Sequence, residues 1–191
     1  MREKVNIGKD ATLYPMPVTL VGANVRGKVN FMAVAWVTRV NSKPPIFAAA
    51  LNNIHYTPEG IRENKTFSIN MPRAGMVEAT DYCGLVSGRR ADKSQVFDVF
   101  YGETKTAPMI QQCPLCFECK LLHIHELPTN TLYLGEVVAA FTEEKYMTEG
   151  QPDIRKIDPF VLSMPDNGYW KVGDYIGKAW NVGKKLKEKP I

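Results

Sequence analysis

Short runs of apolar and β-branched residues, separated by turn residues, recur along most of the chain. Runs of this length, bounded by Gly, Pro, Asn or Asp, are typical of β-strands. The strands predicted in this way are Val18–Ala23, Asn30–Val40, Ile46–Leu51, Thr66–Asn70, Cys119–Leu127 and Thr131–Phe141. Because Gly27 in Arg26-Gly27-Lys28 can adopt a positive φ, we expect the first two strands to form a hairpin.

Two segments have helical start signals or patterning. The first helix is predicted to begin at Thr57-Pro58-Glu59, with threonine as N-cap and proline in the first turn, and to end near Asn64. The second spans about Gly75 to Val86 and precedes the loop SGRRADKS. Many strands with so few helices predict a mainly β fold with short helices, closed or nearly closed into a barrel, because closure removes exposed strand edges.

The composition is that of a folded domain. The 191 residues are 45% hydrophobic, with no internal repeat, low-complexity segment or composition break, so residues 1–191 are expected to form a single domain. The longest apolar stretch, Phe31 to Val37, is far shorter than the roughly 20 residues that cross a bilayer. The polar opening MREKVNIGKD lacks the apolar centre of a secretion signal, which predicts a cytoplasmic protein.

Charge gives little support to nucleic-acid binding. The formal net charge is +4 at pH 7, and no basic stripe is interleaved with aromatic residues. Much of the excess lies in a tail that we expect to be solvated, at Lys184, Lys185, Lys187 and Lys189.

The segment from Asn30 to Thr57 carries the candidate chemistry. It reads as a strand, a Pro44-Pro45 corner, a second strand and a polar loop that leads into the first helix. Free backbone N–H groups of a first helical turn, aided by the helix dipole, can hold a phosphate. The Thr57 hydroxyl and the His55 imidazole can add donors there.

Small residues along the two strands leave room for a flat ring. Strand alternation in MAVAWVT separates two faces: Ala33, Ala35 and Val37 lie on one, and Met32, Val34, Trp36 and Thr38 on the other. The run Ala48-Ala49-Ala50 is expected at a sheet edge, where its backbone groups can hydrogen-bond a ligand. Alanines in strands also mark close packing, so this pattern by itself leaves ligand binding open.

Several separated motifs, in order, resemble the flavin reductase-like FMN-binding split-barrel family, and its flavoredoxin branch in particular. They are VNFMAVAWVTRVNSKPPIFAAALNNIHYT, ENKTFSINMP and DYCGLVSGRRADKS, followed by PMIQQCPLCFECKL, TLYLGEVVAAF and NGYWKVGDYIGKAWNVGK. The resemblance implies a six-stranded Greek-key FMN-binding split β-barrel that holds non-covalent FMN at the interface of a homodimer.

The resemblance also implies which residues bind the cofactor. The ring-lining strand corresponds to Ala33, Ala35, Trp36, Val37 and Thr38, with Asn30 ahead of it. The phosphate and ribityl loop corresponds to Asn52, Asn53, His55 and Thr57, and the loop that closes over the cofactor to Ser87, Gly88 and Lys93. Many reductases of the family carry hydroxyl residues where this chain has Ala33 and Ala35, so backbone groups must serve there. Trp36 either packs beside the ring or belongs to the core.

Flavin carries its own hydride and electron chemistry, so no catalytic side chain is nominated. One hypothesis is an NAD(P)H-dependent flavin or ferric reductase, in which Arg89, Arg90 or Lys93 meets the nucleotide phosphates; a solvated basic loop is the alternative for these residues. A second is a flavoredoxin-type electron carrier with fixed FMN and a redox partner such as ferredoxin. A third is a flavin- or metal-binding module without turnover.

Three cysteines raise the possibility of an iron–sulfur site. Cys113, Cys116 and Cys119 have the C-x2-C-x2-C spacing of a cluster motif, but the fourth ligand is missing and only the distant Cys83 remains. In a strand, the outer two of the three would lie about 20 Å apart. Buried thiols, or a low-pKa Cys83 near the flavin loop, are the alternatives.

Two histidines share a strand face. His123 and His125 in LLHIHEL can begin a metal site only if a third ligand approaches, and no spaced ligand pattern supplies one. A polar strand face is therefore expected, and no metal site is predicted.

Overall fold

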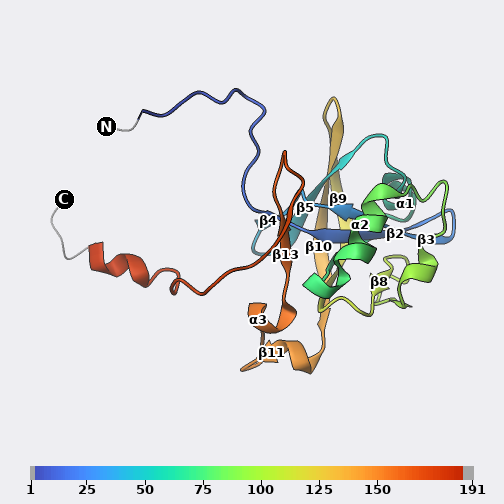
Figure 1. Cartoon of the computed structure of the whole chain (residues 1–191). Coiled ribbons are helices and arrows are strands. Elements are labelled where there is room, and N and C mark those ends of the chain that lie inside the picture. The colour runs from blue at the N-terminus through green and yellow to red at the C-terminus, as the bar shows by residue number, and fades with distance from the viewer. Residues whose placement is uncertain (1–2, 187–191) are drawn as a thin grey trace.

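A seven-stranded antiparallel sheet, in the order β3-β2-β6-β9-β10-β5-β4, forms the body of the protein (Figure 1). The computed structural model describes residues 3–186, so the expectations for Lys187 and Lys189 lie outside the described residues. The strands are β2 (Thr19–Val25), β3 (Lys28–Val34), β4 (Val37–Asn41), β5 (Ile46–Asn52), β6 (Thr66–Met71), β9 (Leu115–Glu126) and β10 (Asn130–Thr142).

The two outermost strands of this order are consecutive in the chain. β3 and β4 are separated only by Ala35 and Trp36, and the segment pairs with β2 by its first half and with β5 by its second. The Ala50 backbone N–H donates to the Trp36 carbonyl at 2.9 Å, which carries the second pairing up to the bend. One bent segment thus connects both ends of the sheet, and counting it once gives six strands. The prediction of one straight strand over Asn30–Val40 is wrong at this bend.

Alternate side chains of β2 and β3 belong to two separate apolar cores. Val21 and Met32 point into an interior core, whereas their neighbours Leu20 and Phe31 point into an outer core. Helix α1 (Thr57–Asn64) contributes Ile61 to the interior core, and helix α2 (Val77–Leu85) contributes Cys83 to the outer one. β2 and β3 are therefore buried on both faces, and each fully buried side chain of this size stabilises the fold by about 1.5–3 kcal/mol.

The predicted hairpin and helices are present, with one wrong assignment. Val25 pairs with Lys28, and Arg26 and Gly27 have φ of 51° and 77°, which confirms the hairpin. α1 has the predicted bounds, but its N-cap is Tyr56, whose side chain makes no capping hydrogen bond. Thr57 is instead the first helical residue.

Short elements complete the chain. They are β1 (Met16–Pro17), β7 (Val99–Phe100), β8 (Met109–Ile110), β11 (Met147–Thr148), β12 (Gln151–Pro152), β13 (Phe160–Leu162), β14 (Tyr169–Lys171), α3 (Ile154–Ile157), η1 (Ala74–Met76), η2 (Ser94–Val96), η3 (Glu144–Tyr146) and η4 (Val182–Leu186). β1, β13 and β14 form a small second sheet. The prediction of a mainly β chain with short helices is confirmed, and none of the described helices is long and apolar enough to cross a membrane.

Two arms leave the body beyond this small sheet. Residues 3–15 form the N-terminal arm and residues 172–186 the C-terminal arm, and both extend to the same side of the body (Figure 1).

Candidate functional site

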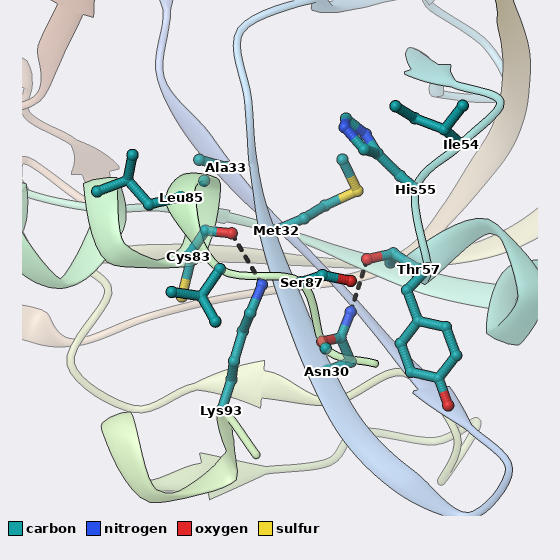
Figure 2. Close-up of a pocket in the computed structure, with 14 residues that line it drawn as sticks. Asn30, Met32, Ala33, Ile54, His55, Thr57, Cys83, Leu85, Ser87 and Lys93 are labelled. Atoms are coloured by element: carbon teal, nitrogen blue, oxygen red, sulfur yellow. Dashed lines mark hydrogen bonds between the residues drawn. The ribbon is translucent and has the colours of Figure 1, made fainter. Parts of the chain in front are cut away.

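A cleft of about 270 Å³ opens between β3, the loop that leads into α1, and the end of α2 with its following loop (Figure 2). The sequence-predicted site residues that line it are Asn30, Ala33, His55, Thr57, Ser87, Gly88 and Lys93. Three segments far apart in the chain therefore meet at one place, as the motifs predict. The binding role of these residues stays a prediction.

Asn30 sits at the centre of this cleft with one polar atom unsatisfied. Its side chain is buried, and its Nδ2 donates to the Thr57 Oγ1 at 2.7 Å. Its Oδ1 is buried with no hydrogen-bond partner in the protein. An orphaned buried acceptor costs about 1–3 kcal/mol, so an Asn at a cleft wall is best explained by a ligand donor such as a hydroxyl group.

Gly88 lies against the same amide. A Cβ at position 88 would meet the Asn30 Oδ1 at 2.1 Å and the Tyr56 ring at 2.9 Å. Only glycine lets the loop after α2 approach Asn30 this closely, so the loop and the amide are fitted to each other.

The N-terminal turn of α1 faces the cleft beside a cluster of positive charge. The first-turn carboxylate of Glu59 is neutralised by Arg89 at 2.5 Å and Arg26 at 3.2 Å. Burial, followed by the charges of Lys93 and Arg89, lowers the pKa of His55. Of these causes, the positive charges of Lys93 and Arg89 would also favour a bound anion, whereas burial disfavours a charge of either sign.

Lys93 places an ammonium group in the wall of the cleft. The side chain is buried, and its Nζ donates to the carbonyls of Phe31 at 2.9 Å and Cys83 at 2.8 Å, which ties β3 to the end of α2. Burial lowers its pKa. An ammonium has three N–H donors, so one remains for a ligand.

Arg89 braces the loop before α1. Besides its pairing with Glu59, it donates to the Ile54 carbonyl at 3.0 Å and stacks over the Tyr56 ring, 5.1 Å from the centroid. Arg90 is exposed and lines a second hollow of about 220 Å³ with Lys28, on the other side of Gly88.

Six predicted site residues lie outside the cleft: Ala35, Trp36, Val37, Thr38, Asn52 and Asn53. The last two instead hold the loop before α1. The Asn52 Oδ1 accepts from the Ile54 N–H at 3.1 Å, and Asn53 bridges the β9–β10 hairpin through the Leu127 carbonyl at 3.2 Å and the Thr131 hydroxyl at 2.7 Å.

The bend in the ring-lining strand changes two predicted placements. Val37 packs with Met32 and Val34 against the interior core, so its predicted position on the face of Ala33 is wrong. Trp36 is 49% exposed, which excludes the core-tryptophan alternative within the single chain. The alanines Ala48 to Ala50 lie in β5, which is paired with β4 on one edge and β10 on the other, so the expected free sheet edge is wrong as well.

Sequence reasoning missed part of the cleft lining. The additional residues are Met32, Ile54, Tyr56, Cys83, Gly84, Leu85 and Val86. The last four directly precede the predicted Ser87, so extending that loop into the helix before it would have found them. Met32 gives no such signal, because alternation assigns it to the opposite face.

The cysteines are structural. Cys119 lies in the interior core, whereas Cys83, Cys113 and Cys116 lie in the outer core, so the three cluster-motif cysteines are divided between two cores and do not share a cluster. Burial raises the pKa of Cys83 to about 11 and that of Cys116 to about 12. The low-pKa Cys83 hypothesis is therefore wrong. Among residues 3–186, no group of His, Cys, Asp and Glu is arranged to hold a metal ion, and His123 and His125 are exposed on β9.

Residues 11–156 match the model of the flavin reductase like domain family, and the chain belongs to that family. Two similar solved structures are flavoredoxins. That of Methanosarcina acetivorans is 57% identical, with a TM-score of 0.95 over 97% of this chain and 100% of its own. That of Desulfovibrio vulgaris (Miyazaki F) is 34% identical, with a TM-score of 0.89 over 95% of this chain and 100% of its own.

A more distant structure shares the fold. It is an FMN-binding protein from Thermus thermophilus, 24% identical, with a TM-score of 0.78 over 93% of this chain and 98% of its own. These likenesses confirm the predicted split-barrel fold class. The chain spans about half the length of one curated relative, from Aeropyrum pernix: the 28% identical match covers 72% of this chain and 53% of that protein.

Proposed function

We propose that the protein binds FMN non-covalently in the cleft and transfers electrons through it. The observation that carries this proposal is the unsatisfied Asn30 Oδ1, next to the N-terminal turn of α1, the His55 imidazole and the Lys93 ammonium group. A phosphorylated polyol attached to a planar ring satisfies all three features. Family membership and the likeness to two flavoredoxins support the same ligand.

Different residues of the cleft fit the phosphate, the ribityl chain and the ring of FMN. The α1 N-terminal turn, with Thr57 and His55, would hold the phosphate, and Asn30 would accept from a ribityl hydroxyl. The small Ala33 and the bend at Ala35–Trp36 would back the ring. Bound flavin supplies hydride acceptance and one- or two-electron release, so the protein needs only to bind, orient and partly shield it.

A homodimer is part of the proposal. The cleft of one chain, at about 270 Å³, falls below the usual range of roughly 300–1,000 Å³ for such pockets. The predicted ring-lining residues Trp36 and Thr38 lie outside it and are exposed. A second copy placed over the bend would complete the ring site. We place this function in the cytoplasm.

The main candidate activity is that of an NAD(P)H-dependent flavin or ferric reductase. The hollow that shares Asn30, Tyr56 and Gly88 with the cleft carries Lys28 and Arg90, which suit the phosphates of a nucleotide. Anaerobic stopped-flow mixing with NADH or NADPH should bleach the bound flavin. No bleaching by either donor would reject this activity.

The alternative is a flavoredoxin-type carrier that exchanges electrons with a protein such as ferredoxin. The 57% identity to a flavoredoxin over almost the whole chain favours it specifically. In that case reduced ferredoxin, and not a pyridine nucleotide, should reduce the flavin.

FMN binding itself is tested on the purified protein. The absorption spectrum should show flavin bands, and the apoprotein should quench FMN fluorescence in a titration. An apoprotein that takes up no FMN would overturn the whole proposal.

A further inference from the structure

The C-terminal arm exposes large apolar side chains almost completely. Tyr175 is 80% exposed, Ile176 98% and Trp180 97%, and the neighbouring Val172, Val182 and Leu186 are exposed as well. Isolated exposed apolar residues need no explanation, but a run of them on one segment marks an interaction surface.

This arm makes no backbone hydrogen bond to the body in the described structure. Its bonds are internal, from Asn181 and Val182 to the Lys178 carbonyl and from Lys184 to the Asn181 carbonyl. The last element anchored to the body is β14, which pairs with β13 up to Lys171. The arm therefore has a defined local turn, and within residues 3–186 its large apolar side chains stay mostly uncovered.

The N-terminal arm is anchored at the same base. β1 pairs with β13, and the Thr12 hydroxyl donates to the Met164 carbonyl at 3.0 Å. It too carries exposed apolar residues, with Leu13 87% and Val5 81% exposed. Figure 1 shows both arms leaving the body on the same side.

We propose that the C-terminal arm clasps a second copy of this chain, with Ile176 and Trp180 as the anchoring side chains. The inference rests on the homodimer of the proposed function and assigns the surface that holds it together. In a two-fold dimer each arm reaches the other copy, so one apolar segment is used twice.

Buried area favours a second copy over a different protein. An aromatic side chain buries about 150–250 Å², so the six apolar residues of the arm offer on the order of 600 Å². Counted with an equal area on the surface they cover, two reciprocal arms bury about 2,400 Å², above the roughly 1,200–2,000 Å² of a standard interface, whereas one arm on an unrelated partner reaches only about 1,200 Å², the lower limit of that range.

The body offers a receiving surface of the matching kind. β4 is the outermost strand of its sheet; Trp36 just before it is 49% exposed and Val40 within it is 50% exposed. Trp36 lies in the bend at which the proposed flavin site needs completion. The arm's clasp would thus hold two copies with their bends in contact.

The test is the dimer dissociation constant of the FMN-loaded protein, measured by sedimentation and by light scattering across a dilution series. The double variant Ile176→Asp/Trp180→Asp should raise this constant at least 100-fold. The matched control Lys178→Asp, on the same arm, should leave it within about threefold. Because the arm lies outside both cores, both variants should keep the wild-type circular dichroism spectrum.

A crosslinking measurement distinguishes the clasp from other ways of dimerising. A benzophenone attached through Lys178→Cys, which leaves both anchoring side chains in place, should yield covalent dimers between subunits on illumination. A double variant that dimerises like wild type, or crosslinks found only within one chain, would overturn the clasp while leaving FMN binding intact. A monomeric wild-type protein whose arm instead binds vesicles of anionic phospholipid would overturn it too, and the fluorescence titration would report separately on FMN.

Discussion

Gly88 is the position where one added carbon should do most damage to the cleft. A Cβ there would lie 2.1 Å from the Asn30 Oδ1, so Gly88→Ala must push the loop away from the amide. We expect the FMN dissociation constant to rise at least about tenfold, or about 1.4 kcal/mol. Fluorescence titration measures it. Gly75→Ala is the control, since nothing lies within 4 Å of a Cβ there, and equal affinities for the two variants would contradict the prediction.

The pKa of His55 should show whether the FMN phosphate binds next to this side chain. In the free protein its pKa is lowered by burial and by the charges of Lys93 and Arg89, so it adds stability above the pKa of the unfolded chain that is lost as the pH falls toward its folded value. A bound phosphate reverses the local charge, and the pKa of His55 should rise on FMN binding.

Proton NMR titration with and without FMN measures this shift, with His55→Gln to assign the signal. The exposed His123 and His125 serve as internal controls and should not move. A His55 pKa that stays the same or falls with FMN would place the phosphate elsewhere.

Some residues of the candidate site were predictable, Thr57 from its place at the helix start and Asn30 and Lys93 from the family resemblance. Asn30, Thr57 and Lys93 all line the cleft. The hydrogen-bond partners of these side chains were not predictable. Thr57 was expected to cap a helix, but it accepts from Asn30, a residue 27 positions away. A local capping rule contains no information about such a partner.

At the scale of elements, β9 fixes a distant loop through a buried carboxylate. Glu118 is fully buried, and its two oxygens accept from the Glu103 N–H at 3.0 Å and from the Thr104 N–H and hydroxyl at 2.8 and 2.6 Å. Glu118→Gln keeps one acceptor and turns an NH₂ group toward these donors. We expect the free energy of unfolding to fall by about 1–3 kcal/mol. This should appear as a lower urea midpoint, with an unchanged dependence of the unfolding free energy on urea concentration.

The neighbouring Glu103 supplies a matched control for this change. Its side chain is exposed, so Glu103→Gln should alter the free energy of unfolding by no more than about 0.5 kcal/mol. If the two variants unfold at the same urea concentration, the carboxylate does not hold the loop as described.

The apolar pattern predicts most strands of the barrel, but it does not predict where a strand is interrupted. The run from Asn30 to Val40 is uninterrupted in composition, and the structure still divides it at Ala35 and Trp36. The division arises because the segment must pair with β2 and then turn to pair with β5, at the opposite end of the strand order. Long-range pairing of this kind has no local sequence signal.

At the scale of the whole molecule, the strands of the barrel were predicted from the sequence and the two arms were not. Nothing beyond Phe141 was predicted as a regular element, yet β13 and β14 form the small sheet from which both arms extend. Strands of three residues are too short for alternation to stand out. The lysine-rich end was expected to be solvated, and Lys184 is exposed; the exposed Ile176 and Trp180 before it were the subject of no prediction.

Global stability should depend on the phosphate of the ligand. A ligand at 100 times its dissociation constant adds about 2.7 kcal/mol to the free energy of unfolding, which for a domain of this size raises Tm by roughly 5–10 °C. Riboflavin has the same ring and polyol but nothing for the α1 N-terminal turn and His55 to hold, so at the same concentration it should raise Tm by less than half as much. Thermal melts followed by circular dichroism measure both shifts. Equal shifts would mean that the ring and polyol provide the binding energy and that the α1 turn is not the phosphate site.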